Sequence, residues 1–180
     1  CLFIPDRLKI ASKALGTAIS AVVLAVSFMV LIKKPLLFRL GNEKILAADN
    51  LSAFIGLGVS FFAFIVAVYS CGYTKRSYGR YFGYLLMSLA ASMGVAYVNH
   101  MLLLIVFWGF LALMLYLLVN LERTARSSAS AKKALIIIGV TDALMIFGIA
   151  LIWKLSGTFS MDGIHLKLNN LSAIAAYLSL

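Results

Sequence analysis

Long apolar stretches, separated by short polar segments, run through almost the whole chain. A helix needs about 20 apolar residues to cross the hydrocarbon core of a bilayer. The longest stretch, 81–121, exceeds one crossing, and the Asn99-His100 pair at its midpoint predicts a turn between two spans. We predict spans at residues 14–32, 51–73, 81–98, 101–121 and 134–155, with the start of another at 170–180. The pattern predicts an all-α integral membrane bundle of five to six spans.

Composition agrees with a membrane protein. Hydrophobic residues make up 63% of the chain and charged residues only 12%, whereas a soluble domain has roughly 45–50% and about 25%. Backbone N–H and C=O groups in lipid must be paired within the chain, so helices are the expected form. The apolar runs also lack the period-two alternation of strands in a membrane barrel.

A net charge of +10 could indicate a nucleic-acid partner, but the basic residues are spread over the loops rather than gathered in one patch. Counted by alternate sides, ten lie on one side: Arg7, Lys9, Lys13, Lys75, Arg76, Arg80, Arg123, Arg126, Lys132 and Lys133. Six lie on the other: Lys33, Lys34, Arg39, Lys44, Lys154 and Lys167. Because positive charge favours the cytoplasm, we predict that the ten-residue side is cytoplasmic. No nucleic acid is expected as a partner.

The cysteines and the chain ends add little chemistry. Cys1 and Cys71 are too few for a disulfide framework, and the chain shows neither zinc-ligand spacing nor a phosphate loop, so no cofactor or metal is expected. A lipoprotein matured at Cys1 is a minor alternative. The chain begins and ends inside apolar runs, so we expect residues 1–180 to be one transmembrane domain cut from a longer protein.

Asp142 is the acidic residue that lies inside a predicted span, while the other five acids lie in loops or at span edges. It follows Lys133 by nine residues, roughly 13 Å deeper and about 180° around the helix, so a partner must come from another helix. A carboxylate in lipid is costly, which favours a proton-relay or gating role. The alternative is a polar residue that caps a helix break or bonds a neighbouring backbone.

Two further residues are candidates for proton transfer. Lys133, with Lys132, begins the predicted helix, where paired lysines usually anchor a span by reaching to the interface. His100 lies in the tight turn between two spans and titrates near neutral pH, so it could admit protons. A plain turn residue is the more frequent outcome for such a histidine.

Several segments, in order, resemble one family of membrane proteins. They are "ADNLSAFI", "YGRYFGYLLMSLAASMGVAYVNHMLLLIVFW", "YLLVNL", "AKKALIIIGVTDALMIFGIAL" and "SGTFSMDGI". Together they are similar to the third to sixth helices of the antiporter-like proton-translocating subunits. These occur in respiratory complex I (NADH:quinone oxidoreductase), in membrane-bound hydrogenases and in multisubunit Na+/H+ antiporters. The resemblance extends over most of residues 49–180.

The resemblance implies a proton-conducting half-channel. In the family, a Glu in the fifth helix pairs with a Lys in the seventh, and an Asp lies in the sixth. Asp142 matches that Asp, and Lys133 matches the basic residue at the start of the same helix. Gly109 occupies the position of the fifth-helix Glu, after Trp108. Asn99 and His100 replace the usual Asp-Asn pair.

The resemblance therefore leaves several functions open. The first is a proton- or cation-translocating subunit of a redox-driven complex, non-catalytic itself, with the redox centres on other subunits. The second is a degenerate subunit that only fills a place in the membrane arm, because a half-channel without its Glu cannot switch unchanged. The third is a Na+/H+ or inorganic-carbon transporter. We expect other membrane-arm subunits, lipid, and protons or Na+ as partners, in a bacterial or archaeal cytoplasmic membrane.

Overall fold

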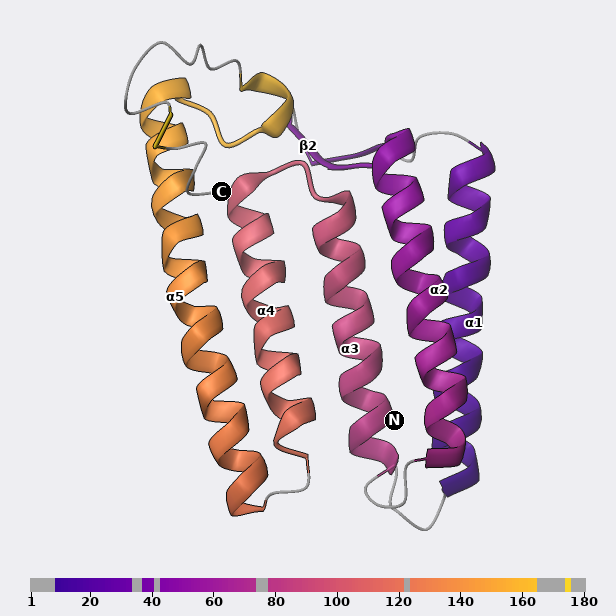
Figure 1. Ribbon diagram of the computed structural model, residues 1–180. Coiled ribbons are helices and arrows are strands. Elements are labelled where there is room, and N and C mark those ends of the chain that lie inside the picture. Colours follow the sequence, from indigo (N-terminus) through magenta and orange to yellow (C-terminus); the bar gives the residue numbers. More distant parts are fainter. Residues whose placement is uncertain are drawn as a thin grey trace.

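Five long helices stand side by side in the computed structural model, which describes residues 9–33, 37–40, 43–73, 78–121, 124–164 and 174–175 (Figure 1). They are α1 (Lys9–Lys33), α2 (Asn50–Tyr73), α3 (Tyr78–Tyr97), α4 (Met101–Val119) and α5 (Ala125–Ser156). Each overlaps one of the five complete spans that the sequence predicts, although α1 and α5 begin several residues earlier. Apart from two helical residues, 174 and 175, the predicted start of a further span lies outside the described residues.

Among the described residues, α1, α2, α4 and α5 are long and apolar enough to cross a membrane. The chain is a multi-pass integral membrane protein. The helix that misses this criterion, α3, is the central one, since it packs against α1, α2 and α4. Because its neighbours shield much of its surface from lipid, α3 can carry more polar residues than a lipid-facing helix.

Small residues are the most deeply buried ones on α1 and α2, for example Ser20, Ser60 and Ala67. Large apolar side chains on these helices, such as Phe54 and Phe62, are mostly exposed, as expected where lipid is the solvent. Membrane helices gain little by hiding apolar surface from lipid, so small residues that permit close approach favour association. The described helices bury five serines: Ser12, Ser20, Ser27, Ser60 and Ser70.

Gly16 of α1 lies against Phe82 of α3. A Cβ atom added there would lie within 3 Å of the ring of Phe82, which is fully buried. We expect Gly16→Ala to destabilise the bundle by about 1–3 kcal/mol, the usual cost of overpacking. Thermal unfolding of the purified protein in detergent measures the change. Gly58→Ala is the matched control, because no described atom lies within 4 Å of a Cβ there; an equal loss in both variants would contradict this packing.

A β-hairpin joins α1 to α2, where the sequence analysis expected only a loop. Strands β1 (Leu37–Leu40) and β2 (Glu43–Ala47) are antiparallel, and Phe38 pairs with Leu46. The hairpin lies across one end of the bundle, which we call the hairpin side (Figure 1). The α3–α4 turn and the segment after α5 lie at the same end.

Three connections meet on the hairpin side through the backbone of Asn99. The Asn99 N–H donates to the carbonyl of Ile45 in β2, and the Asn99 carbonyl accepts from the N–H of Met161. The Asn99 side-chain amide also donates to the carbonyl of Lys44. The predicted turn at Asn99-His100 is therefore confirmed, and hydrogen bonds fix it on two sides. Asn99 itself is buried.

Helix α5 begins at Ala125, nine residues before the predicted span. Thr124 caps it: the Thr124 hydroxyl accepts from the Ser127 N–H at 3.1 Å, and the Thr124 N–H donates to the Ser127 hydroxyl at 3.0 Å. This capping box satisfies backbone N–H groups that would otherwise lack partners. Lys132 and Lys133 thus lie two turns inside the helix instead of starting it, which corrects the sequence-based expectation.

Candidate functional site

The predicted intramembrane acid finds its partner on the neighbouring helix. The indole N–H of Trp108, in the middle of α4, donates to a carboxylate oxygen of Asp142 in α5 at 3.0 Å. Asp142 lies near the middle of α5 and is half-buried. Its helix begins at a cap and runs without interruption past this residue, so the structure does not support the alternative in which Asp142 caps a helix break.

The Trp108–Asp142 pair lies at the surface of the described bundle, since Trp108 is 39% exposed. A charged carboxylate facing lipid would cost several kcal/mol by most estimates. One indole N–H offsets only part of that cost, because a carboxylate has room for about four hydrogen bonds. The Trp108 indole therefore satisfies only part of the hydrogen-bonding capacity of the Asp142 carboxylate.

Gly109 has open space beside it. No described atom lies within 4 Å of a Cβ built at this position, which is exposed on α4 next to Trp108. A Cβ atom at this position would meet no described neighbour. Asp142 is accordingly the acid that the described spans place in the α4–α5 pair.

The structure does not bring Lys133 or His100 to Asp142. Lys133 is exposed on α5, nine residues and about 13 Å along the helix axis from Asp142. His100 precedes α4 on the hairpin side. The centroid of its ring lies 5.9 Å from the centroid of the Phe159 ring. The three candidates therefore occupy three levels along α4–α5: Lys133 near one end, Asp142 in the middle and His100 at the hairpin side.

A hollow of about 890 Å³, the hairpin-side hollow, opens where β2, α2 and the α3–α4 turn meet. Its lining includes the polar residues Lys44, Asp49, Asn99 and Asp162 and apolar residues such as Leu104. Lys44 and Asp162 form an ion pair at 3.3 Å, with side chains 40% and 54% exposed. Neither Asp49 nor Asp162 was a predicted site residue, because both lie outside the predicted spans.

Asp49 in this wall also caps α2. Its carboxylate accepts from the Ser52 N–H at 2.7 Å, and hydrogen bonds from the Ser52 side chain and backbone lower the pKa of Asp49. A lowered pKa stabilises the folded state above the ordinary Asp value, and that stability is lost as the pH falls through the lower folded value.

We expect Asp49→Ala to lower the free energy of unfolding by about 1 kcal/mol at neutral pH, as the loss of an N-cap does. The loss should shrink below about pH 4, where the ordinary Asp becomes protonated. Denaturant unfolding in detergent at several pH values measures it. Asp49→Asn keeps the acceptor without the charge, so a pH-dependent stability that persists in that variant would assign the effect to another group.

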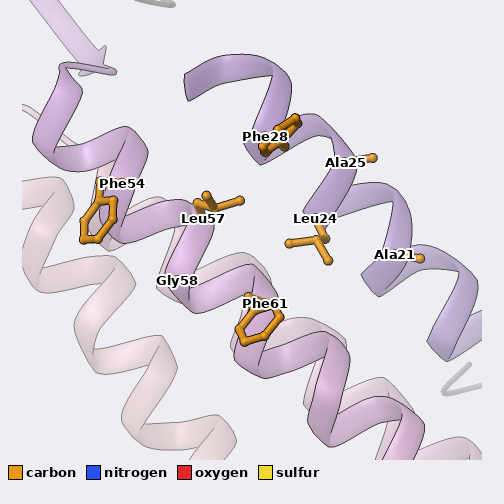
Figure 2. A pocket seen from close by; sticks show the side chains of 8 residues that line it. All are labelled: Ala21, Leu24, Ala25, Phe28, Phe54, Leu57, Gly58 and Phe61. Carbon is orange, nitrogen blue, oxygen red and sulfur yellow. The ribbon is translucent and has the colours of Figure 1, made fainter. Parts of the chain in front are cut away.

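Two further hollows lie along α1 and are apolar. One, of about 580 Å³, lies between α1 and α2, with Phe28 on one helix and Phe54 and Phe61 on the other (Figure 2). Its lining contains no titratable side chain. The other, of about 660 Å³, lies between α1 and α3 below β2, and Ser27 and Tyr97 supply its polar atoms. Neither lining includes an acidic side chain.

Comparisons with known proteins find similar sequences. Residues 98–180 match the family described as "NADH:quinone oxidoreductase/Mrp antiporter, TM". The chloroplastic NAD(P)H-quinone oxidoreductase subunit 5 of Chaetosphaeridium globosum is 33% identical over 126 residues, which are 68% of this chain and 19% of the relative. A Na(+)/H(+) antiporter subunit of Alkalihalophilus pseudofirmus is 30% identical over 129 residues, 69% of this chain and 16% of the relative.

Solved structures share the fold. A chain of respiratory complex I from Thermus thermophilus aligns with a TM-score of 0.78 at 20% identity, covering 95% of this chain and 38% of that one. A chain of the Mrp complex from Dietzia aligns with a TM-score of 0.83 at 17% identity, covering 97% and 21%. The all-α membrane fold and the predicted resemblance are confirmed. The chain spans about a fifth of the length of the curated relatives named here.

Proposed function

We propose that this antiporter-like membrane chain moves protons, or another small cation, through its α4–α5 pair, with Asp142 as the group that takes up and releases charge. The observation that carries the proposal is the hydrogen bond from Trp108 to Asp142. This hydrogen bond joins the middle of α4 to a carboxylate near the middle of α5. Both helices are long and apolar enough to span a membrane. Intramembrane acids in such positions mark ion pathways.

The proposed setting is a multisubunit membrane complex whose redox centres belong to other subunits. Among the described residues, no group of three His, Cys, Asp or Glu side chains could hold a metal ion. The similar chains belong to structures described as respiratory complex I and the Mrp complex, which supports other membrane subunits as partners. We place the chain in a bacterial or archaeal cytoplasmic membrane, although a chloroplastic relative is also similar.

A second candidate is cation exchange without electron transfer. It rests on the similarity to the Na(+)/H(+) antiporter relative from Alkalihalophilus pseudofirmus and to a chain of the Mrp complex. Both candidate functions use Asp142, and a measurement of ion flux distinguishes them. Uptake of labelled Na+ into vesicles that contain the full protein, with no electron donor present, would favour exchange over redox-driven proton transfer.

Asp142→Asn tests the proposal directly. The assembled complex carrying this variant should retain its subunits and its electron-transfer centres but lose proton or cation flux in reconstituted vesicles. A degenerate subunit that only fills space would behave differently, because Asp142→Asn and Gly109→Glu would then both be silent. Normal flux in the Asp142→Asn complex would refute the proposal.

A further inference from the structure

The apolar hollow of about 660 Å³ between α1 and α3, which we call the α1–α3 slot, matches one leaflet of a bilayer in depth. Its lining extends from Ile19 to Val30 on α1 and from Leu86 to Tyr97 on α3. Each of these segments has a length of about 16 Å along its helix. Half of a hydrocarbon core of about 30 Å is about 15 Å. The slot therefore has the depth of the leaflet on the hairpin side.

Packed side chains close the slot at its inner end, and the hairpin lies at its outer end. Gly16 of α1 lies against the fully buried ring of Phe82 about one turn before the slot begins. Leu46 of β2 contributes to the lining from the hairpin. Between these ends the slot is open toward lipid, because Val22 and Val26 in its α1 wall are 61% and 51% exposed. A lipid chain can therefore enter it from the side.

The interior of the slot is apolar, and its lining contains no charged side chain. Of its two polar side chains, Ser27 donates its hydroxyl hydrogen to the carbonyl of Val23 at 2.9 Å. The hydroxyl of Tyr97 lies against Gly56 of α2. Apolar cavities stay dry, and an empty one forfeits dispersion contacts of the atoms that line it. In a membrane, an acyl chain supplies those contacts.

A basic residue lies at the level where the phosphate of such a lipid belongs. Lys33 is exposed in the last turn of α1, on the hairpin side. It follows Val30 by three residues, which is about 4.5 Å along the axis and 60° around it. Lys33 therefore shares the face of α1 that lines the slot. Lysines at such helix ends extend their ammonium groups to the interface, where charge complementarity favours a lipid phosphate.

We propose that the α1–α3 slot binds one acyl chain of a glycerophospholipid from the leaflet on the hairpin side, with the lipid phosphate beside Lys33. The chain fills the space that side chains leave open between α1 and α3, beyond the contact of Gly16 with Phe82. The bound lipid is thus a structural part of the bundle. The inference is independent of the proposed function, because no residue of α4 or α5 lines the slot.

The test uses the full protein in its complex, loaded with phosphatidylglycerol that carries a photoreactive diazirine near the end of one acyl chain. Washing in mild detergent before illumination leaves only firmly held lipid. Mass spectrometry of the peptides should then find the label near Ile19 and Leu86, at the inner end of the slot. A diazirine next to the ester should label near Val30 and Tyr97 instead. Label spread evenly over the outer faces of the helices would contradict a held lipid.

Filling the slot supplies a matched pair of variants. Ala90 of α3 is exposed and lines the slot, so Ala90→Phe places a ring in the space proposed for the chain. Labelling of the slot should fall at least about tenfold, the size of a typical overpacking penalty. Ala25→Phe makes the same change in the hollow between α1 and α2 (Figure 2) and should leave slot labelling unchanged. Undiminished labelling in Ala90→Phe, or an equal loss in both variants, would overturn the inference.

Lys33→Gln tests the headgroup contact at an exposed position, where folding does not depend on the side chain. The washed complex should retain about fivefold less phosphatidylglycerol, the size of the attraction of one lysine for an anionic membrane surface. Lys154→Gln, exposed in the last turn of α5 on the same side, should retain the normal amount. Unchanged retention in Lys33→Gln would overturn the proposed lipid contact, and a helix of another subunit cross-linked in the slot would overturn the inference as a whole.

Discussion

Replacing Asp142 with Asn is expected to reduce proton or cation flux through the assembled complex by at least about a hundredfold, the contribution of a positioned acid–base group. Asn has nearly the same shape as Asp but cannot take up a proton or carry a charge. Its side-chain oxygen can still accept from the Trp108 indole, so the α4–α5 contact should persist. Electron transfer and proton flux, measured together in proteoliposomes, report the loss.

Two companion variants separate chemistry from packing. Asp142→Glu keeps the carboxylate and should retain part of the flux. Thr141→Val changes the neighbouring residue, whose hydroxyl donates to the carbonyl of Ile138 within α5, and should leave the flux unchanged. If Thr141→Val lost as much flux as Asp142→Asn, the effect would belong to the helix rather than to the carboxylate.

The second large effect is expected from Trp108→Phe. Phe keeps an aromatic ring but removes the N–H that donates to Asp142. A hydrogen bond to a charged group contributes about 1.5–3 kcal/mol, and about 1.4 kcal/mol corresponds to a factor of ten in rate. Flux should therefore fall at least roughly tenfold, because Asp142 loses the hydrogen bond that Trp108 donates to it.

Trp153→Phe is the matched control for this prediction. Trp153 is the other tryptophan of the chain; it is exposed near the hairpin-side end of α5 and stacks on Phe159. Its replacement should leave flux close to that of the unmodified complex. Trp108→His, which retains a ring N–H, should recover part of the flux lost in Trp108→Phe. Unchanged flux in Trp108→Phe would show that the hydrogen bond has no part in transfer.

The sequence predicts the helices well because lipid imposes a simple rule on them. Each span must be long and apolar, so runs such as 51–73 mark α2 almost to the residue. Apolarity does not predict a helix end that is set by hydrogen bonds. Helix α5 starts at Ala125 because Thr124 and Ser127 form a capping box, a signal independent of apolarity. Counting apolar residues alone placed that start beyond the lysines.

The hairpin was missed for a similar reason. A search for spans treats 33–50 as a loop, yet "LFRL" and "EKILA" flank Gly41-Asn42, a pair typical of two-residue hairpin loops. The hairpin matters for function, since its backbone bonds to Asn99 and encloses the hairpin-side hollow. Attention to turn chemistry in the loop could have found it.

The candidate site was predictable only in part. Asp142 stands out in the sequence because an acid within an apolar run is costly, and the need for a partner on another helix follows from helix geometry. That this partner is Trp108 depends on how α4 is rotated against α5, which sequence periodicity does not determine when almost every residue of α4 is apolar. The separation of Lys133 and His100 from Asp142 likewise required the structure.

The central claim is that Asp142 changes its protonation state during transport. Infrared difference spectroscopy of the complex during turnover measures this directly, because a protonated carboxyl group in a membrane has a C=O stretch distinct from that of a carboxylate. The account predicts a carboxyl band that appears and disappears with turnover, is absent in Asp142→Asn and shifts in Trp108→Phe. A turnover spectrum that Asp142→Asn leaves unchanged would contradict it.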